Sequence, residues 1–240
     1  MENTIFIALS RQTGLEQKMS VLANNIANVN TPGYRAQNTV FNQYLVEGED
    51  KNKDIYQVLD YGEYMNTSAG SISQTGNPMD LAIKGDAYFA VQTPQGLGYT
   101  RAGKLTLNIN NELVNPAGYP ITDDGGNPIT LPANAKEFIV DETGTISTDQ
   151  GTIGKLNLIE FANQQNLKAA GNGVYLTDDQ GVPSTTSRVI QGAYEKSNVQ
   201  GVLEMSRMIE TSRDYQSLSR VLQGDHERQR SMIQKLSSSN

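Results

Sequence analysis

The sequence lacks several residue types on which common kinds of protein chemistry depend. It contains no cysteine, so disulfides, thiolate catalysis and cysteine–metal sites are excluded. It contains no tryptophan and a single histidine, His226, which lies in the polar stretch DHERQR near the C-terminus. A solvated helix position explains this histidine more simply than a catalytic role, and no GxSxG motif accompanies it.

Basic residues and long apolar runs are also scarce. The formal net charge of −7 argues against nucleic acid as a partner, because phosphate binding needs clustered Lys and Arg. Residues 1–30 hold only Arg11 and Lys18, too few for a membrane-surface helix. No segment is long enough to span a bilayer. The opening MENTIFIALSRQ has an acidic start and only a short apolar run, so it does not resemble a secretory signal peptide. We expect a cytosolic chain, or one that leaves the cell without a cleaved signal, and no membrane insertion.

Motifs for cofactors and metals are missing too. No P-loop or GxGxxG occurs. The carboxylate pairs Asp123-Asp124 and Asp178-Asp179 lie in glycine-containing turns without EF-hand spacing, which favours solvated loops. We therefore expect no catalytic residue, no cofactor and no bound metal.

What the sequence does contain is a division into three zones at 46/47 and 196/197. The first and last zones hold two glycines each and together one proline, whereas the middle holds eighteen glycines and seven prolines. The two ends can therefore be helical, and the middle is rich in turns. Each end carries a net charge of +1 and the middle carries −9. Nearly neutral ends can pack against copies of themselves, while an acidic middle stays solvated.

The N-terminal zone carries an apolar stripe at strict 3–4 spacing. Seven of its eight positions are apolar: Ile5, Ala8, Gln12, Leu15, Met19, Leu22, Ile26 and Val29. Such a heptad pattern predicts a helix of about 28 residues, roughly 42 Å long. One interpretation is an amphipathic helix folded onto its own domain.

The C-terminal zone carries two adjoining stripes of the same kind. Val202, Met205 and Ile209 form one stripe. The other is formed by Met208, Tyr215, Leu218, Leu222, Met232 and Leu236. Gly224 interrupts the run, and we expect a bend or a weak point there.

The middle zone has the pattern of short strands separated by turns. Predicted strands are Leu81–Ile83, Tyr88–Val91, Lys104–Ile109, Glu112–Val114, Phe138–Val140, Leu156–Phe161, Val174–Leu176 and Val189–Tyr194. Asn110-Asn111 is expected to form a two-residue hairpin turn. Turns every 8–12 residues suggest a barrel-like or sandwich β domain. Residues 34–78 carry five of the eleven tyrosines, and we expect an extended connector with little core of its own.

The predicted end of the first helix is unfavourable for helix formation, because LANNIANVNTPGYR combines four asparagines with Pro32-Gly33. Asn24, Asn25 and Asn28 lie away from the apolar stripe, where amides can pair between helices. Burying one apolar stripe against a single partner offsets the backbone entropy only marginally. We therefore expect the terminal helices to contact several neighbouring copies.

Three regions of the chain, the two ends and the middle, contain segments that resemble the flagellar rod, hook and hook-associated proteins. LANNIANVNTPGYR is similar to their N-terminal signature, and NVQGVLEMSRMIETSRDYQ (198–216) to their closing helix. GNPMDLAIKGDAYFAV (76–91), YTRAGKL (99–105) and LVNPAGYPI (113–121) resemble the β-domain core of rod and hook proteins. The opening, NTPGYRAQ and the length are most similar to F-type proximal rod subunits. The distal G-type is the alternative, although Pro32 and Tyr34 depart from its usual signature.

The resemblance implies an α+β fold in which long terminal helices form a coiled-coil-like core segment, with an inserted all-β middle domain outside it. The expected domains are an axial helix (1–33), a connector (34–78), a β-rich domain (79–196) and a second axial helix (197–240). The implied function is a non-enzymatic subunit of the basal-body rod. Its implied partners are copies of itself, other rod subunits and the flagellar type III export apparatus, and its implied location is the rod that spans the periplasm.

The predicted assembly interface combines residues of both terminal helices with the Pro-Gly turn. Its residues are Ile5, Leu15, Met19, Leu22, Asn24, Asn25, Ile26, Asn28, Pro32, Gly33, Tyr34, Val202, Met205, Met208, Ile209, Tyr215, Leu218 and Leu222. Three alternatives stay open: a distal rod or hook-type axial protein, a regulator that caps the rod, and a secreted β-domain enzyme or adhesin with incidental terminal coils.

Overall fold

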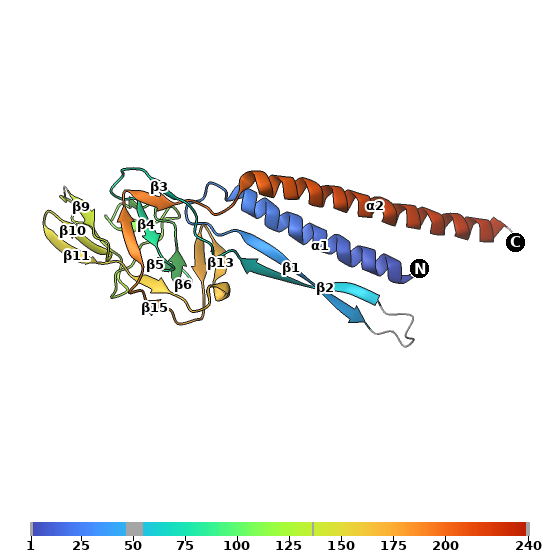
Figure 1. Cartoon of the computed structure of the whole chain (residues 1–240), viewed down its shortest axis with the longest axis horizontal. Coiled ribbons are helices and arrows are strands. Elements are labelled where there is room, and N and C mark those ends of the chain that lie inside the picture. Colours follow the sequence, from blue (N-terminus) through green and yellow to red (C-terminus); the bar gives the residue numbers. More distant parts are fainter. Residues whose placement is uncertain (1, 47–54, 136, 239–240) are drawn as a thin grey trace. The chain divides into compact units, whose positions relative to one another are not determined.

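Two long helices begin and end the chain, and short strands fill the sequence between them (Figure 1). The computed structural model describes residues 2–46, 55–135 and 137–238. Contacts within the chain divide it into two compact units. Unit 1 comprises Met1–Ala27, Gln37–Tyr64 and Gln200–Asn240, and unit 2 comprises Asn28–Ala36 and Met65–Val199.

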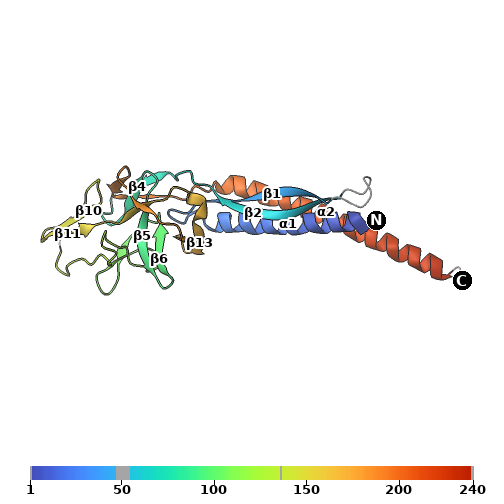
Figure 2. The ribbon, with the colours of Figure 1, turned by 90° about the horizontal axis from the view of Figure 1, so that it is seen from below.

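Unit 1 is built from α1 (Glu2–Ala27), α2 (Gly201–Ser238) and the hairpin strands β1 (Gln37–Val46) and β2 (Ile55–Met65). The helices run antiparallel and side by side, with the hairpin along α1 (Figures 1 and 2). At 1.5 Å per residue, the 38 residues of α2 span about 57 Å and the 26 residues of α1 about 39 Å.

The two helices lie where the sequence predicts them, and two details of the prediction concern Val29 and Gly224. The predicted apolar stripe of the first helix ends at Ile26, because the helix stops at Ala27 and Val29 lies in the turn before Pro32. The second helix is continuous through Gly224, the position at which the sequence predicts a bend or a weak point, so the glycine does not end the helix. A single glycine costs only about 1 kcal/mol inside a helix, and the flanking helix formers carry it.

Unit 2 consists of short antiparallel strands. The largest sheet has the order β13-β14-β6-β5-β12-β15. Its strands are β13 (Lys168–Gly171), β14 (Val174–Leu176), β6 (Gly96–Thr100), β5 (Tyr88–Thr93), β12 (Leu158–Glu160) and β15 (Val182–Pro183). A short helix, Gln164–Asn166, precedes β13.

Smaller ladders complete unit 2. The pairs are β4 (Leu81–Lys84) with β16 (Arg188–Gln191), β3 (Ile72–Gln74) with β17 (Ala193–Glu195), and β7 (Thr106–Leu107) with β8 (Leu113–Val114). The three-stranded sheet β11-β10-β9 comprises Gly151–Lys155, Thr145–Thr148 and Phe138–Val140.

The core of unit 2 joins these sheets. Its fully buried members include Leu81, Phe89, Leu113, Ile121, Ile146 and Leu156. A second cluster is aromatic, in which the ring of Tyr88 meets those of Phe161 and Tyr175 edge to face at 6.0 and 6.1 Å. Burial on this scale makes unit 2 a β domain with a core of its own.

The prediction of an α+β chain with a β-rich middle is confirmed, but individual strands differ. The predicted strand Val189–Tyr194 is two strands, because Gly192 has a φ of 77° and breaks the ladder between them. The predicted two-residue turn at Asn110-Asn111 is wrong. The loop has three residues, Ile109 to Asn111, since the amide of Asn108 donates to the carbonyl of Glu112 at 3.0 Å and Asn111 adopts a left-handed φ of 59°.

Residues 34–78, which the sequence predicts as an extended connector, contain β1, β2 and β3. The first two pair with each other in unit 1, and β3 pairs with β17 in unit 2. Unpaired extended backbone would leave its amides and carbonyls without partners, and the ladders satisfy them.

Candidate assembly surface

Polar contacts set the register of the two helices of unit 1. The Tyr215 hydroxyl accepts a hydrogen bond from Nε2 of Gln12 at 2.8 Å and donates to Oε1 of Glu16 at 2.9 Å. Near the other end of α1, Nδ2 of Asn25 donates to Oε2 of Glu204 at 3.0 Å. A change of one residue in register would break all three bonds, so the helices have one defined alignment.

Asn25 connects three elements of unit 1. Its side chain is 1% exposed, and Nδ2 also donates to the carbonyl of Gln37 at 2.8 Å while Oδ1 accepts from the Gln37 amide at 2.9 Å. Glu204, 5% exposed, also pairs with Arg207 one turn along α2 at 2.8 Å. The amide therefore joins α1, β1 and α2, which explains why an asparagine is kept near the end of an apolar helix.

Substituting Asn25 with Ala is expected to destabilise unit 1 by about 1–3 kcal/mol, because Gln37 and Glu204 would be left with unpaired buried polar groups. Chemical denaturation followed by helical circular dichroism measures this loss. Gln216, exposed on α2, is the control, and its replacement by Ala should change stability by less than about 0.5 kcal/mol. Equal stability of both variants would contradict the role of Asn25.

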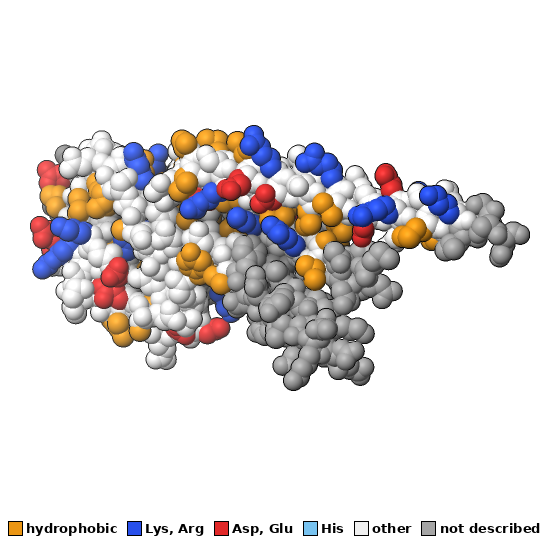
Figure 3. Space-filling view, turned by 45° about the vertical axis from the view of Figure 1, so that its right-hand side comes forward, with side chains coloured by type: hydrophobic (Ala, Val, Ile, Leu, Met, Phe, Trp, Pro, Cys, Tyr) orange, Lys and Arg blue, Asp and Glu red, His pale blue; other side chains and the backbone are white. Residues whose placement is uncertain are grey.

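The side of α2 that faces away from these contacts carries an exposed apolar stripe, which we call the α2 stripe and define as Val202, Met205 and Ile209. These side chains are 77%, 48% and 55% exposed. Spacings of three and four residues place them on one side of a helix, and Glu204 and Thr211 lie on the opposite, buried side. Hydrophobic and basic side chains are exposed side by side along the helices of unit 1 (Figure 3).

The other predicted interface residues of the helices are divided between the interior and the surface. Leu22 is buried, Asn24 is exposed, and six apolar or aromatic side chains are half-buried: Leu15, Met19, Ile26, Met208, Leu218 and Leu222. Tyr215 and Asn28 are half-buried as well. The side chain of Ile5 lies outside the described residues. Within one chain, the half-buried positions leave part of their apolar surface exposed.

Pro32, Gly33 and Tyr34 belong to unit 2. Gly33 adopts a φ of 68°, and its amide donates to the carbonyl of Glu195 at 2.8 Å. A Cβ at this position would lie 2.3 Å from the carbonyl carbon of Arg101, so no side chain fits. The Pro-Gly pair thus turns the chain tightly against β17 of unit 2.

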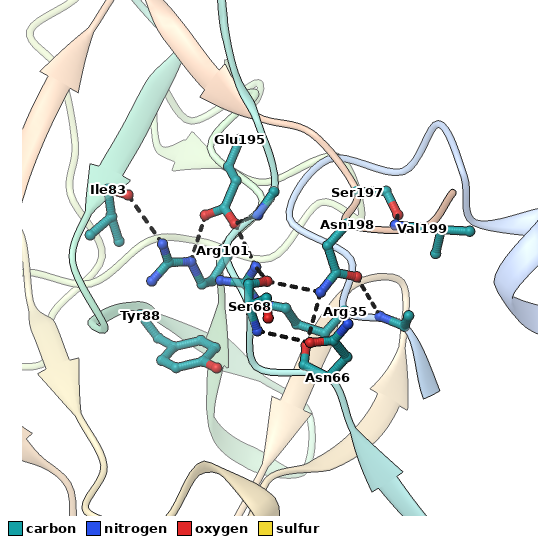
Figure 4. Close-up of polar contacts among 12 residues, drawn as sticks. Arg35, Asn66, Ser68, Ile83, Tyr88, Arg101, Glu195, Ser197, Asn198 and Val199 are labelled. Carbon is teal, nitrogen blue, oxygen red and sulfur yellow. Dashed lines mark hydrogen bonds and ion pairs between the residues drawn. The ribbon is translucent and has the colours of Figure 1, made fainter. Parts of the chain in front are cut away.

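A buried ionic cluster lies beside this turn, and sequence reasoning missed it. We call it the Arg–Glu–Arg cluster: Nη1 of Arg35 is 2.7 Å from Oε1 of Glu195, and Nε of Arg101 is 2.6 Å from Oε2 (Figure 4). All three side chains are 2% exposed or less. Their positions are far apart in the sequence, and no local pattern marks them as partners.

Backbone groups complete the Arg–Glu–Arg cluster. Arg101 donates to the carbonyls of Ile83, Gly85 and Ala87 at 2.6–3.1 Å, and its guanidinium lies 5.6 Å from the ring centroid of Tyr88. Burial raises the pKa of the Tyr88 hydroxyl, although the neighbouring Arg35 and Arg101 cations oppose that rise. The cluster is therefore a satisfied structural network, apart from Nε of Arg35, which has no partner.

Asn198 ties together three chain segments at the edge of unit 2. Its Oδ1 accepts from the Ala36 amide at 2.7 Å, and its Nδ2 donates to the carbonyls of Asn66 and Ser68 at 2.9 and 2.8 Å (Figure 4). The chain passes between unit 1 and unit 2 at four places, and Ala36, Met65 and Val199 are the unit 2 residues at three of them. One side chain thus holds the three segments at defined positions within unit 2.

The residues considered for catalysis or metal binding lie at the exposed helix and turn positions that the sequence predicts. His226 is exposed on α2, Asp178 and Asp179 are exposed, and Asp123 accepts from the Asn127 amide in a turn. Among the described residues, no group of three or more His, Cys, Asp or Glu could hold a metal ion. No described helix is long and apolar enough to cross a membrane.

Comparison with known proteins decides the family. Residues 5–35 match the model of flagella basal body rod proteins, 82–148 that of the flagellar hook protein FlgE/F/G D1 domain, and 190–235 that of the flagellar basal body rod FlgEFG protein C-terminal region. The chain is 36% identical to the flagellar basal-body rod protein FlgF of Rhizobium meliloti, with 92% of each chain covered. It is 32% identical to FlgF of Caulobacter vibrioides over 98% of each. The chain belongs to the flagellar basal-body rod protein family.

Membership of this family confirms the prediction of a structural, non-enzymatic rod subunit, and the similarity supports the F-type. G-type relatives match at 29–33% identity, for example FlgG of Bacillus subtilis at 29% over 92% of the chain and 94% of the relative. The three ions of the Arg–Glu–Arg cluster lie in three different matched segments. The segments that resemble the family are therefore the ones that meet in unit 2.

Proposed function

We propose that this rod subunit polymerises through its terminal helices and forms part of the proximal rod, the drive shaft that swimming requires. The single observation that supports this mechanism is the α2 stripe. Val202 is 77% and Ile209 55% exposed, although both belong to a helix whose opposite side is packed. Exposed apolar residues at helical spacing are typical of a surface that another molecule covers.

The energetics favour contacts with several neighbours rather than one. Complete burial of three such side chains contributes about 1.5–3 kcal/mol each. Association of two molecules costs about 4–15 kcal/mol, so a single stripe is marginal. A subunit that contacts neighbours on several sides gains the free energy of each contact. The entropy cost of ordering its helix pair is incurred only once. Weak contacts between two isolated subunits and stable contacts in a polymer are the expected result.

The α1–α2 pair of unit 1 acts, in this proposal, as the coiled-coil-like segment of the rod. Buried residues such as Leu22 and Asn25 stabilise the pair, and half-buried and exposed ones contact neighbouring copies. A stripe that meets a different surface on the next subunit makes a heterologous contact, which generates a helical tube when it does not close. The domains 1–33, 34–78, 79–196 and 197–240 then serve as axial helix, connector, outer β domain and second axial helix.

The partners in this proposal are copies of the chain and other rod subunits, and the site of assembly is the part of the rod that spans the periplasm. The type III export apparatus would deliver the chain with its helices unpacked and without a cleaved signal peptide. A distal-rod or hook-type role is the second candidate. It is favoured by the G-type relatives, which reach 33% identity over 94% of the chain.

The test is removal of the chromosomal gene and complementation with the full chain. Cells without the chain are expected not to swim, and the complementing chain is expected in isolated basal bodies, detected by immunoblot and by labelling in electron microscopy. Label near the inner-membrane end of the rod supports the proximal assignment, and label near the hook supports the distal one. Swimming cells without the chain, or complete rods that lack it, would contradict the proposal.

A further inference from the structure

The tip of the β7–β8 hairpin in unit 2 carries the most exposed large hydrophobic side chain of the described residues. Ile109 is 99% exposed, in the three-residue loop between the strands. Loop positions of this kind favour Gly, Asn and Asp, and an isoleucine there contributes nothing to the fold of its own chain. The residue has no structural partner within the described part of unit 2.

The hairpin holds Ile109 in a defined position. Oδ1 of Asn108 accepts from the amides of Asn110 and Glu112, both at 2.9 Å, and its Nδ2 donates to Oε2 of Glu112 at 2.7 Å. The base of the hairpin is anchored by Leu113, which is fully buried. A rigid apolar tip loses little entropy on binding, so it is preorganised for a contact. The carboxylate of Glu112 lies at the foot of the same tip.

A groove elsewhere in unit 2 has matching properties. It measures about 400 Å³ and lies along β4, β9 and β16. The apolar residues Val140, Val189 and Ile190 line it, of which the first two are almost fully buried, and the exposed carboxylate of Glu142 lines it as well. Lys84 and Arg188 line it as well and are directly opposite each other in the β4–β16 ladder. Two like charges at opposed positions destabilise a ladder, and neither cation forms an ion pair with a carboxylate of the described residues.

We propose that the β7–β8 tip of one subunit inserts Ile109 into the β4–β16 groove of a second copy of this chain. The apolar side chain would cover the apolar floor, and the Glu112 carboxylate would approach Lys84 and Arg188. Charge complementarity supports a copy as the occupant, since residues 47–196 carry a net charge of −9, whereas the groove, with two cations and the single carboxylate of Glu142, carries +1. Tip and groove are different surfaces, so the contact is heterologous and can repeat along a tube.

This contact goes beyond the proposed function, because it joins the β units rather than the terminal helices. The chain has no cysteine, so in the purified chain an engineered pair reports on the contact without background. A variant with Ile109→Cys and Glu142→Cys places one thiol on the tip and one on the exposed rim of the groove. Mild oxidation of isolated basal bodies, and of the purified full chain at high concentration, is expected to give disulfide-linked dimers and larger species on a non-reducing gel.

Controls separate the contact from random collision. Either single variant is expected to stay monomeric, as is Ile109→Cys combined with Val182→Cys on β15, where the valine is 60% exposed. Adding Lys84→Gln and Arg188→Gln to the reporting pair should slow cross-linking several-fold. In a cysteine-free chain, Ile109→Ser should weaken self-association about 10- to 100-fold.

Three outcomes would overturn the proposal: no cross-link in either preparation, dimers of the Ile109→Cys single variant, and cross-links only to a different rod protein. Each leaves the proposed function intact if the variants still restore swimming and are found in basal bodies. If a variant neither restores swimming nor enters basal bodies, the purified chain decides the question. The proposal then requires the same cross-link between purified subunits.

Discussion

Replacing Glu195 with Ala is expected to lower the free energy of unfolding of unit 2 by about 3–5 kcal/mol. Glu195 is 1% exposed and is the carboxylate that separates the buried Arg35 and Arg101 cations. Its removal would leave two buried guanidinium groups without a counter-charge, and their mutual repulsion would add to the loss. The Gly70 amide, which donates to Oε1 of Glu195 at 2.7 Å, would also lose its acceptor.

The measurement is chemical denaturation of the full chain, followed by tyrosine fluorescence, to which unit 2 contributes six of the eleven tyrosines. Glu195→Gln tests charge separately, because the amide keeps the shape and one acceptor oxygen, and it should fall between wild type and Glu195→Ala. Glu142→Ala is the matched control, since its carboxylate is exposed, and its effect should stay below about 0.5 kcal/mol. A loss of less than about 1 kcal/mol for Glu195→Ala would show that the cluster is not essential to unit 2.

Loss of swimming is the expected result of introducing Asp at both Met205 and Ile209. These side chains are 48% and 55% exposed within one chain, so the substitutions should leave its fold intact. In the assembled rod these side chains would be covered by a neighbour. Each substitution by Asp therefore removes about 1.5–3 kcal/mol of stabilisation from apolar burial. The summed loss weakens each contact about 10²- to 10⁴-fold, before the cost of burying two carboxylates is added.

Swimming on soft agar and recovery of the chain in isolated basal bodies measure this effect. The variant with Met205→Leu and Ile209→Val keeps the stripe apolar and should swim, and Ser217→Asp adds a charge to another exposed position of α2 with little effect. The purified Asp variant must unfold at the same temperature as the wild-type chain, which shows that its fold is intact. Cells that swim with both aspartates in place would show that the α2 stripe does not bind a neighbour.

Local patterns of the sequence predict the elements with a periodic signal. The 3–4 spacing from Ile5 to Ile26 predicts α1, and the near absence of glycine and proline after residue 197 predicts α2. The alternation of short apolar runs and turns predicts strands such as Phe138–Val140, which coincides with β9. These signals are local, because hydrogen bonds and side-chain direction repeat within one helix or strand.

Local sequence patterns do not predict the β1–β2 hairpin. Its strands contain polar and charged residues such as Gln37, Asp60 and Glu63, and eight residues of the sequence lie between them. Pairing between β1 and β2 is stabilised by backbone hydrogen bonds and by the neighbouring α1, which a single segment cannot indicate. The three-residue loop at Ile109 was mispredicted for a related reason, since the side chain of Asn108 selects the loop length.

For the interface residues, sequence spacing predicts which ones share a side of a helix but not which side stays exposed. Met208 and Ile209 are adjacent and both apolar, yet the first is half-buried and the second exposed. That difference depends on where α1 packs, which Gln12, Asn25, Glu204 and Tyr215 set through hydrogen bonds between distant segments.

By itself, the sequence determined the class of this protein: two nearly neutral helical ends, an acidic β-rich middle and motifs of the flagellar rod family. Those properties depend on composition and short-range periodicity, which one stretch of chain carries alone. Only the tertiary structure decided the Arg35–Glu195–Arg101 cluster, the alignment of α1 with α2, and the exposure of Ile109. Each of these depends on groups far apart in the sequence, whose burial and pairing exist only after the chain has brought them together.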